Sequence, residues 1–352
     1  MDRYYYSERP DLGFNIPFVI FYPKDESSKL VAANFMTPPV TNKSNLKDIF
    51  SELKEKSYPG GIFSENDTIT IVPLIPRFNG YAMPYYTSMV YKNETELIKE
   101  LDESEREKMK DIDVQLIKLF KYALDIIYKK GYDVDDKIIL NGYSASSKFV
   151  TAFSCLHPEI CRAVIAGGTT GLMIRPIKEI NGVKLNFPLG INDVETDLEE
   201  FAKIPKFFYI GDEDNNDPAL CKCKLDDKKD VNGNVLPKLD ENGNIIPGLK
   251  DGKYQAYYKS LYTDEEIDII YRYFGTFPLD RYENAKQIYS NNKINSSFNI
   301  YKGNHVTVTR DPHFISDLNN FIQKLNSKNK KRTYWGTFSF MFCSIICYFI
   351  IY

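Results

Sequence analysis

The sequence predicts an α/β fold in which a mostly parallel sheet is covered by helices. Short apolar runs alternate along the chain with longer segments of helical periodicity. Several of the short runs are apolar at every position, which is typical of strands buried on both faces of a parallel sheet. The chain has 352 residues, 43% of them hydrophobic, so it is long enough to bury a large core.

Seven segments are predicted as strands, because each is a short apolar run bounded by polar or turn-forming residues. They are Phe18 to Tyr22, Leu30 to Phe35, Thr68 to Pro73, Ile138 to Leu140, Ala163 to Ala166, Phe207 to Ile210 and Phe298 to Tyr301. The clearest helix runs from Ser104 to Lys130, with one apolar stripe, a serine at its start and Gly131 after its end. A last amphipathic helix is predicted over Phe314 to Leu325.

Charge and cysteine usage restrict the class of protein. The chain has 45 Lys and Arg residues against 48 Asp and Glu residues, so no basic surface is offered to nucleic acid. Its six cysteines show no disulfide framework. The N-terminal stretch carries an acidic residue and a proline where a secretory signal needs a basic start and an unbroken apolar run. We therefore expect a reduced, cytoplasmic protein that does not bind nucleic acid.

A polar insert of about residues 219–262 interrupts the alternation of strands and helices. It contains two similar ten-residue units, "DVNGNVLPKL" from Asp230 and "DENGNIIPGL" from Asp240. Their Asn-Gly pairs favour tight turns, so we predict a pair of small hairpins. A calcium loop is the alternative, but the glycine stands at the fourth position instead of the sixth. Cys221 and Cys223 alone make a poor zinc site. We expect no metal and no organic cofactor.

The stretch "KIILNGYSASSKFV" raises the question of chemistry, because an apolar strand breaks abruptly at Gly142-Tyr143-Ser144 before a helix over Lys148 to Leu156. A serine on such a strand-to-helix turn can be a nucleophile, with the N–H of Ala145 as one oxyanion donor. An ordinary connecting loop is the alternative, since short patterns of this kind arise by chance and Ser146 replaces the usual glycine. Ser144 can therefore act as a nucleophile only if the chain supplies a base beside it.

Only three histidines are available as that base. His157 lies beyond the helix that follows Ser144, too far away for contact. His313, at the start of the last helix, is explained by a surface or capping position. His305, in "NIYKGNHVTVT", follows an apolar strand in a glycine-containing loop, where a base would lie over the carboxyl edge of the sheet. An exposed loop histidine is the alternative for His305.

The carboxylate that orients the base is expected at the end of a strand between Ser144 and His305. The segment "KFFYIGDEDNNDP" supplies such a strand, followed by several acidic residues. A solvated acidic turn is the alternative, but the chain order Ser, Asp, His is the one associated with this type of turn. We predict Asp214 in this role, with Asp217 as the second choice.

These segments together resemble the α/β-hydrolases, and more narrowly the bacterial hydrolases related to polyhydroxybutyrate depolymerases and their esterase relatives. The resemblance covers most of Phe18 to Leu325. It is carried by "GYSASS", "FVTAFSCLHPEICRAVIAGG", "LNFPLGINDVE", "FFYIGDEDNND", "FGTFPLDRYENAKQIY" and "YKGNHVT". Relatives commonly have glycine where this chain has Ser147. The insert repeats and the C-terminal tail lie outside the resemblance.

The resemblance implies a catalytic triad of Ser144, Asp214 and His305. It also implies a second oxyanion donor in the loop after the strand "LVAANF", from the backbone of Phe35 or Met36. The expected activity is hydrolysis of a small-molecule or polymeric ester through an acyl-enzyme. A thioesterase or peptidase, a non-catalytic binding protein of the same fold, and a membrane-tethered scaffold are the alternatives.

The loop "PLIPRFNGYAMPYY" is predicted to shape the substrate pocket through its aromatic and cationic side chains, although core packing also explains aromatic residues. These side chains are Arg77, Tyr81, Tyr85 and Tyr86.

The C-terminal end of the chain is predicted to lie outside the hydrolase domain, which we assign to residues 1–326. A basic linker, 327–334, precedes an uncharged apolar segment, 335–352. As a helix this segment would be about 27 Å long, close to the thickness of a bilayer core. We expect a tail anchor that holds the catalytic domain at the cytoplasmic face. Packing of the segment on the body, or disorder, is the alternative.

Overall fold

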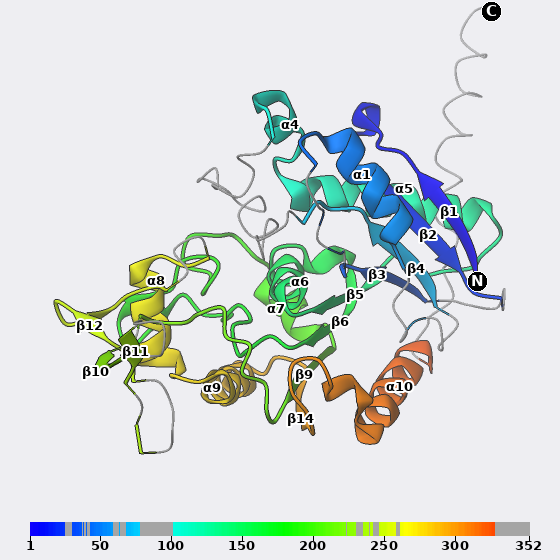
Figure 1. The fold of residues 1–352 in the computed structure, drawn as a ribbon. Helices are drawn as coiled ribbons and strands as arrows, with labels where there is room; N and C mark the ends of the chain where they lie inside the picture. Colours follow the sequence, from blue (N-terminus) through cyan, green and yellow to red (C-terminus); the bar gives the residue numbers. More distant parts are fainter. Residues whose placement is uncertain are drawn as a thin grey trace, which may run out of the picture.

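The central feature of the fold is one eight-stranded sheet. The computed structural model describes residues 1–24, 30–36, 38, 40, 43–58, 63, 68–77, 101–222, 224–229, 235–238, 240–241, 246–257 and 261–327. The strands of the sheet lie in the order β1-β2-β4-β3-β5-β6-β9-β14 (Figure 1). Strand β2 runs antiparallel to both of its neighbours, and every pair from β4 to β14 is parallel. The predicted α/β class is therefore confirmed.

All seven predicted strands are present, and β1 is an addition. The eight strands are β1 (Asp2–Tyr6), β2 (Phe18–Tyr22), β3 (Val31–Asn34), β4 (Ile69–Pro73), β5 (Ile138–Tyr143), β6 (Cys161–Gly167), β9 (Lys206–Gly211) and β14 (Ser296–Tyr301). The residues of β2 to β5 are almost all buried, as their apolar runs indicate. Strand β1 lies at the edge of the sheet and begins with polar residues, so it is not an apolar run and was not predicted.

Helices cover both faces of the sheet. Alternate residues of a strand point to opposite faces. Tyr5 of β1 lies 4.2 Å from the Lys54 ammonium of α1 (Leu46–Lys56), whereas Tyr6 stacks on Phe18, which contacts Tyr122 of α5 (Ile112–Lys129). Helices α1 and α5 therefore lie on opposite faces.

The same alternation continues through the centre of the sheet. In β5, Ile138 and Leu140 share a core cluster with α5 and α6 (Ala145–Leu156). Ile139, between them, belongs to a second cluster with α10 (Pro312–Ser327). Helices α7 (Leu198–Lys203) and α9 (Pro278–Asn291) contribute to the first cluster. Among the residues that the structure describes, α10 is the only helix that covers the second face at β5, β6 and β9. This helix also forms one wall of the candidate site.

The predicted single helix over Ser104 to Lys130 is wrong, because the chain forms two helices there, α4 (Glu103–Lys108) and α5. Asp111 between them adopts a left-handed conformation, with φ of 47°. The Gln115 side chain donates to the carbonyl oxygens of Lys108 and Lys110, at 2.8 and 2.6 Å, and so satisfies groups that a continuous helix would have bonded internally. Gly131 ends α5 with φ of 100°, as predicted.

The insert forms small hairpins, as predicted, but the second hairpin is closed by a different turn. Strands β10 (Leu225–Lys229) and β11 (Val235–Pro237) pair around the first Asn-Gly unit. Strands β12 (Leu249–Lys250) and β13 (Lys253–Tyr254) pair around Asp251-Gly252 instead of the second unit. Both turn residues have positive φ, at 52° and 75°, as a tight hairpin turn requires.

The insert continues into α8 (Asp264–Ile269) and a short π-helix, η4 (Ile270–Phe274). With the β7 (Glu179–Ile180) and β8 (Val183–Lys184) hairpin it shares a separate apolar cluster that includes Leu172, Leu185, Tyr262 and Phe274. Figure 1 shows this part at the side of the sheet away from α1 and β1. The remaining short elements are η1 (Pro10–Leu12), η3 (Pro158–Ile160) and η5 (Val308–Arg310). The assignment of residues 1–326 to one domain stays a prediction.

A buried lysine marks the start of β9. The Nζ of Lys206 donates to the carbonyl oxygens of Phe201 and Ile204, at 2.5 and 2.8 Å, and the residue is 2% exposed. Burial lowers the pKa of Lys206 from 10.5 to about 7, while the Cys155 and Cys161 thiols act in the opposite direction.

The free energy of unfolding should therefore rise with pH between about pH 7 and pH 9. In this window the unfolded chain still holds the Lys206 proton that the folded protein has released, so unfolding takes up a proton. One such group contributes up to about 1.4 kcal/mol per pH unit. Urea unfolding at several pH values should give a smaller slope against pH for Lys206→Met than for the parent chain. Equal slopes would contradict the buried, weakly basic lysine.

Candidate active site

Ser144 stands on a sharp turn at the carboxyl end of β5. Its backbone has φ of 58° and ψ of −120°, a strained conformation for a residue with a side chain, and α6 begins at the next residue. Such strain costs on the order of 1–3 kcal/mol and persists only where the surroundings enforce it. Here the Ser144 N–H donates to the Gly167 carbonyl oxygen of β6 at 2.9 Å. The turn therefore holds the serine at the edge of the sheet, as the sequence predicts for a nucleophile.

The neighbours of Ser144 explain how this turn departs from the usual glycine pattern. The Ser146 hydroxyl accepts from the Tyr143 N–H at 3.0 Å and donates to the Tyr143 carbonyl oxygen at 2.9 Å. The Ser147 hydroxyl donates to the Ser144 carbonyl oxygen at 2.5 Å. Both serines are buried. Their side chains fill space that glycine would leave empty, and the local hydrogen bonds satisfy their hydroxyls.

Glycine is required at position 142. A Cβ atom there would lie 2.3 Å from the Ser146 carbonyl oxygen and 2.8 Å from the Ser147 nitrogen, both backbone atoms that cannot move without displacing α6.

Gly142→Ala should therefore lower the free energy of unfolding by about 1–3 kcal/mol or more, because the new methyl group overlaps the backbone. The matched control is Gly131→Ala, where an added Cβ meets nothing within 4 Å and only the positive φ opposes it. Urea unfolding of both variants measures the difference. A Gly142→Ala protein as stable as Gly131→Ala would show that the turn is not packed as described.

His305 and Asp214 lie in contact, on the loops that follow β14 and β9. The Nδ1 of His305 is 2.9 Å from Oδ2 and 3.0 Å from Oδ1 of Asp214, whose side chain is fully buried. The Asn216 N–H also donates to Asp214 Oδ1, at 3.1 Å. A carboxylate that accepts from Nδ1 holds the imidazole with Nε2 free to take a proton.

The loop that carries His305 is fixed from two sides. The Gly303 N–H donates to Asp212 Oδ1 at 2.9 Å, and the Glu213 N–H donates to the Gly303 carbonyl oxygen at 3.1 Å. The Tyr143 hydroxyl donates to the carbonyl oxygen of His305, and the two rings lie 5.1 Å apart. Burial raises the pKa of Tyr143, with the Asp214 charge adding to the effect, so this hydroxyl stays protonated as a donor. This support of the histidine by Tyr143 was not predicted from the sequence.

Asp217, the second choice for the acid, has another partner. Its Oδ2 lies 2.6 Å from the guanidinium of Arg281, which is completely buried, and its Oδ1 accepts from the Ala219 N–H at 2.9 Å. The structure therefore places Asp214 and not Asp217 against His305.

The other two histidines lie elsewhere. The Nε2 of His157 is 2.8 Å from Asp113 at the start of α5. His157 lies after the C-terminal end of α6, whereas Ser144 precedes its first residue. His313 is exposed at the start of α10, where its backbone N–H donates to Asp311.

The backbone donors predicted for an oxyanion differ in their availability. Ala145 is the first residue of α6 and lines a small cavity beside Ser144. The N–H of Phe35 donates to the Asn141 carbonyl oxygen at 3.0 Å and the Phe35 side chain is buried, so the structure does not favour Phe35. Met36 lines the cavity that contains Ser144, which leaves Met36 as the predicted second donor.

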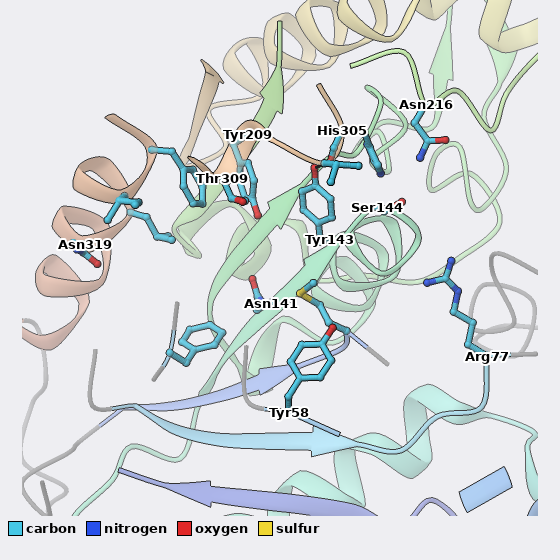
Figure 2. Close-up of a pocket in the computed structure, with 16 residues that line it drawn as sticks. Tyr58, Arg77, Asn141, Tyr143, Ser144, Tyr209, Asn216, His305, Thr309 and Asn319 are labelled. Atoms are coloured by element: carbon cyan, nitrogen blue, oxygen red, sulfur yellow. Dashed lines mark hydrogen bonds between the residues drawn. The ribbon is translucent and has the colours of Figure 1, made fainter. Parts of the chain in front are cut away.

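Ser144 and His305 line the same cavity, which has a volume of about 690 Å³ (Figure 2). Its walls are mainly apolar or aromatic and include Tyr58, Phe63, Tyr209, Phe314, Ile315 and Leu318. The last three belong to α10. The amphipathic pattern of this helix indicates that one of its faces is buried, but not that this face lines a cavity, so its role in the site was not predicted. Asn141 also lines the cavity and donates to the buried Asn34 side chain at 2.9 Å.

Of the four residues predicted to shape the pocket, only Arg77 is described, and it lines the cavity. Its carbonyl oxygen accepts from the Val40 N–H at 2.7 Å, which fixes the backbone after β4. Tyr81, Tyr85 and Tyr86 lie outside the described residues.

The predicted membrane anchor, 335–352, and the basic linker, apart from residue 327, also lie outside the described residues. Within the described ranges, none of the helices combines the length and the apolar character needed to cross a bilayer. Nor do three metal-binding side chains gather anywhere in those ranges.

The sequence matches no family model and no curated protein. Among solved structures the chain is similar to a ferulic acid esterase, with 14% identity, a TM-score of 0.43 and coverage of 93% of this chain and 97% of the other. It is also similar to Est1E from Butyrivibrio proteoclasticus, with 13% identity, a TM-score of 0.38 and coverage of 93% and 100%. A third similar structure is an S-formylglutathione hydrolase from Agrobacterium tumefaciens, with 10% identity, a TM-score of 0.41 and coverage of 92% of this chain and 94% of the other.

At these identities the fold assignment rests on the chain itself: on its strand order, on the antiparallel β2 and on the turn at Ser144. These features define the α/β-hydrolase fold, as predicted. The narrower resemblance to polyhydroxybutyrate depolymerases stays a prediction.

Proposed function

We propose that the protein is a serine hydrolase that cleaves carboxylic esters with Ser144 as nucleophile, His305 as base and Asp214 as the orienting acid. The observation that carries the proposal is the placement of three separate loops around one cavity. Ser144 on its strained turn and His305, held by the buried Asp214 carboxylate, both line that cavity. A serine hydroxyl needs such a base because it is a weak nucleophile by itself.

Acylation follows from these positions. The Nε2 of His305 takes the Ser144 proton as Oγ attacks the ester carbonyl carbon. The oxygen of the tetrahedral intermediate becomes an anion, which the predicted oxyanion donors, the N–H groups of Ala145 and Met36, stabilise. His305 then gives its proton to the leaving alcohol, and the acyl group remains on Ser144. Asp214 stabilises the charged imidazole while the proton is held there.

Deacylation repeats these steps with water as the nucleophile. His305 removes a proton from water, the acyl group leaves Ser144 as a carboxylic acid, and the serine recovers its proton. The residues named here supply every proton transfer in the cycle.

The cavity indicates a substrate with a sizeable apolar part. Its aromatic and aliphatic walls exclude water around that part of the ester and contribute binding through buried apolar area. A small-molecule ester and the end of a polymeric ester both fit this description. Thioester or amide cleavage by the same residues is the second candidate function, because the triad acts on any acyl carbonyl.

Ser144→Ala should lower kcat for hydrolysis of p-nitrophenyl esters on the order of 10⁶-fold, and His305→Ala by a similar amount, because nucleophile and base act as one unit. His313→Ala is the matched control, since that side chain is exposed on α10 and should leave the rate unchanged. Release of p-nitrophenol measures all three. A Ser144→Ala protein with substantial remaining activity would refute the nucleophile, and an active His305→Ala protein would refute the base.

Asp214 and Asp217 should respond differently to replacement by asparagine. Asp214→Asn keeps the shape but cannot stabilise the charged His305, so kcat should fall on the order of 10⁴-fold. Asp217→Asn leaves the buried Arg281 guanidinium without its charged partner and should mainly lower stability, by about 3–5 kcal/mol. Kinetics and urea unfolding of both variants separate the two effects. The reverse pattern would make Asp217 the functional acid.

A further inference from the structure

A second, smaller cavity adjoins Ser144. Its volume is about 180 Å³, and it shares Ser144, Arg77 and Asn216 with the larger cavity. Most residues that line this smaller cavity are polar or cationic, whereas the walls of the larger one are mainly apolar. The residues that it does not share are Ala145, Lys148, Gly168, Thr170 and Pro218.

Lys148 is the buried cation of the smaller cavity. It follows Ser144 by one turn of α6, so the two residues lie on the same side of the helix start. The residue is only 2% exposed, and the hydrogen bond recorded for its ammonium joins it to the Tyr262 hydroxyl at 3.4 Å. A buried ammonium is normally paired with a carboxylate, and none of the described carboxylates forms an ion pair with Lys148.

The carboxylate that acts on Lys148 is already paired with another buried cation. The nearest buried carboxylate, Asp217, is taken by Arg281 at 2.6 Å. The buried guanidinium of Arg175 donates to the carbonyl oxygens of Met173 and Arg281, so it adds charge without a described acidic partner. Burial, with the repulsion of Arg281 added, lowers the pKa of Lys148 to about 7, against the opposing effect of Asp217. An anion beside Lys148 would supply the missing negative charge.

Two further groups are placed to receive the same anion. The Thr170 hydroxyl has no hydrogen-bond partner among the described residues, although the residue is 1% exposed and lines the cavity. Arg77 lines both cavities, and Figure 2 shows its guanidinium on the same side of the site as Asn216. A donor left unpaired in a buried position costs free energy that a bound acceptor would recover.

We propose that the smaller cavity binds a carboxylate carried by the ester substrate, with Lys148 and Thr170 at its buried end and Arg77 at its mouth. The proposal rests on the proposed function and names its substrate class: an ester with a short anionic arm on one side of the scissile carbonyl and an apolar part on the other. Ser144 stands where the two cavities meet, so both parts are held while the carbonyl carbon lies at its Oγ. A single carboxylate matches the single buried cation that lines the cavity.

The test compares two matched pairs of substrates on the purified full chain. The first pair places the carboxylate on the acyl side, p-nitrophenyl hydrogen glutarate against p-nitrophenyl pentanoate. The second places it on the alcohol side, 3-carboxyphenyl butanoate against phenyl butanoate. Labelling of Ser144 by a fluorophosphonate, which carries no carboxylate, reports the nucleophile independently. The ratio of kcat/KM within each pair is the measured preference, and the pair that shows it identifies the side that carries the anion.

Three variants assign that preference to residues. Lys148→Met removes the buried cation with little change of volume, and Arg77→Gln removes the cation at the mouth. Lys206→Met is the matched control, since Lys206 is also a buried lysine of lowered pKa but lies at the opposite end of the sheet's strands from Ser144. Arg77→Gln keeps the test decisive if Lys148→Met does not fold.

We expect the anionic ester of one pair to be preferred by about tenfold or more, the scale of a hydrogen bond to a charged group. The preference should fall to near one in Lys148→Met, decrease in Arg77→Gln and persist in Lys206→Met. Equal hydrolysis within both pairs, with Ser144 still labelled, would overturn the carboxylate site and leave the esterase intact. A preference that survives in Lys148→Met would also overturn it. Absence of both labelling and hydrolysis would instead refute the proposed function, and this inference with it.

Discussion

The strained backbone at Ser144 is the constraint on which the rest of the site depends. It is held by the hydrogen bond from the Ser144 N–H to Gly167, by the absence of a side chain at Gly142 and by the hydroxyls of Ser146 and Ser147. Because the turn is also the start of α6, it fixes three things together: the serine oxygen, the N–H of Ala145, and the direction in which Lys148 leaves the helix. The proposed nucleophile, the proposed oxyanion donor and the lysine of the smaller cavity are therefore set by one local geometry.

The parallel sheet brings the partners of this turn to it. Strands β5, β6, β9 and β14 are neighbours, so the loops that follow them meet at one edge although they are far apart in the sequence. Asp214 and His305 are 91 positions apart, yet their side chains lie 2.9 Å from each other. Removal of the Asp214 carboxylate from water is offset by the His305 contact and the Asn216 N–H, and the Tyr143 hydroxyl fixes the backbone of the histidine loop. The site is thus an arrangement of short loops at one edge of the sheet.

Much of this arrangement could be predicted from the sequence, because it depends on local patterns. Apolar runs reveal buried strands, the break at Gly142 reveals the turn, and the order of the chain indicates which acid and histidine meet. The parts that could not be predicted depend on contacts between distant residues. The wall supplied by α10 results from its docking below β9, and the pairing of Asp217 from the burial of Arg281. The break at Asp111 is local, but the bonds of the Gln115 side chain that stabilise it do not follow from an apolar pattern. Lys148 lies within the predicted helix, but nothing in its neighbourhood along the chain signals that its ammonium is buried.

The central claim is that Ser144 carries the acyl group during the reaction, and trapping of that intermediate tests it most directly. The protein is mixed with p-nitrophenyl acetate, quenched in acid within the first turnovers and digested for peptide mass spectrometry. An acetyl group is expected on Ser144 in the parent chain and none in Ser144→Ala. Acetylation at another residue with Ser144 unmodified, while p-nitrophenol is released catalytically, would contradict this claim.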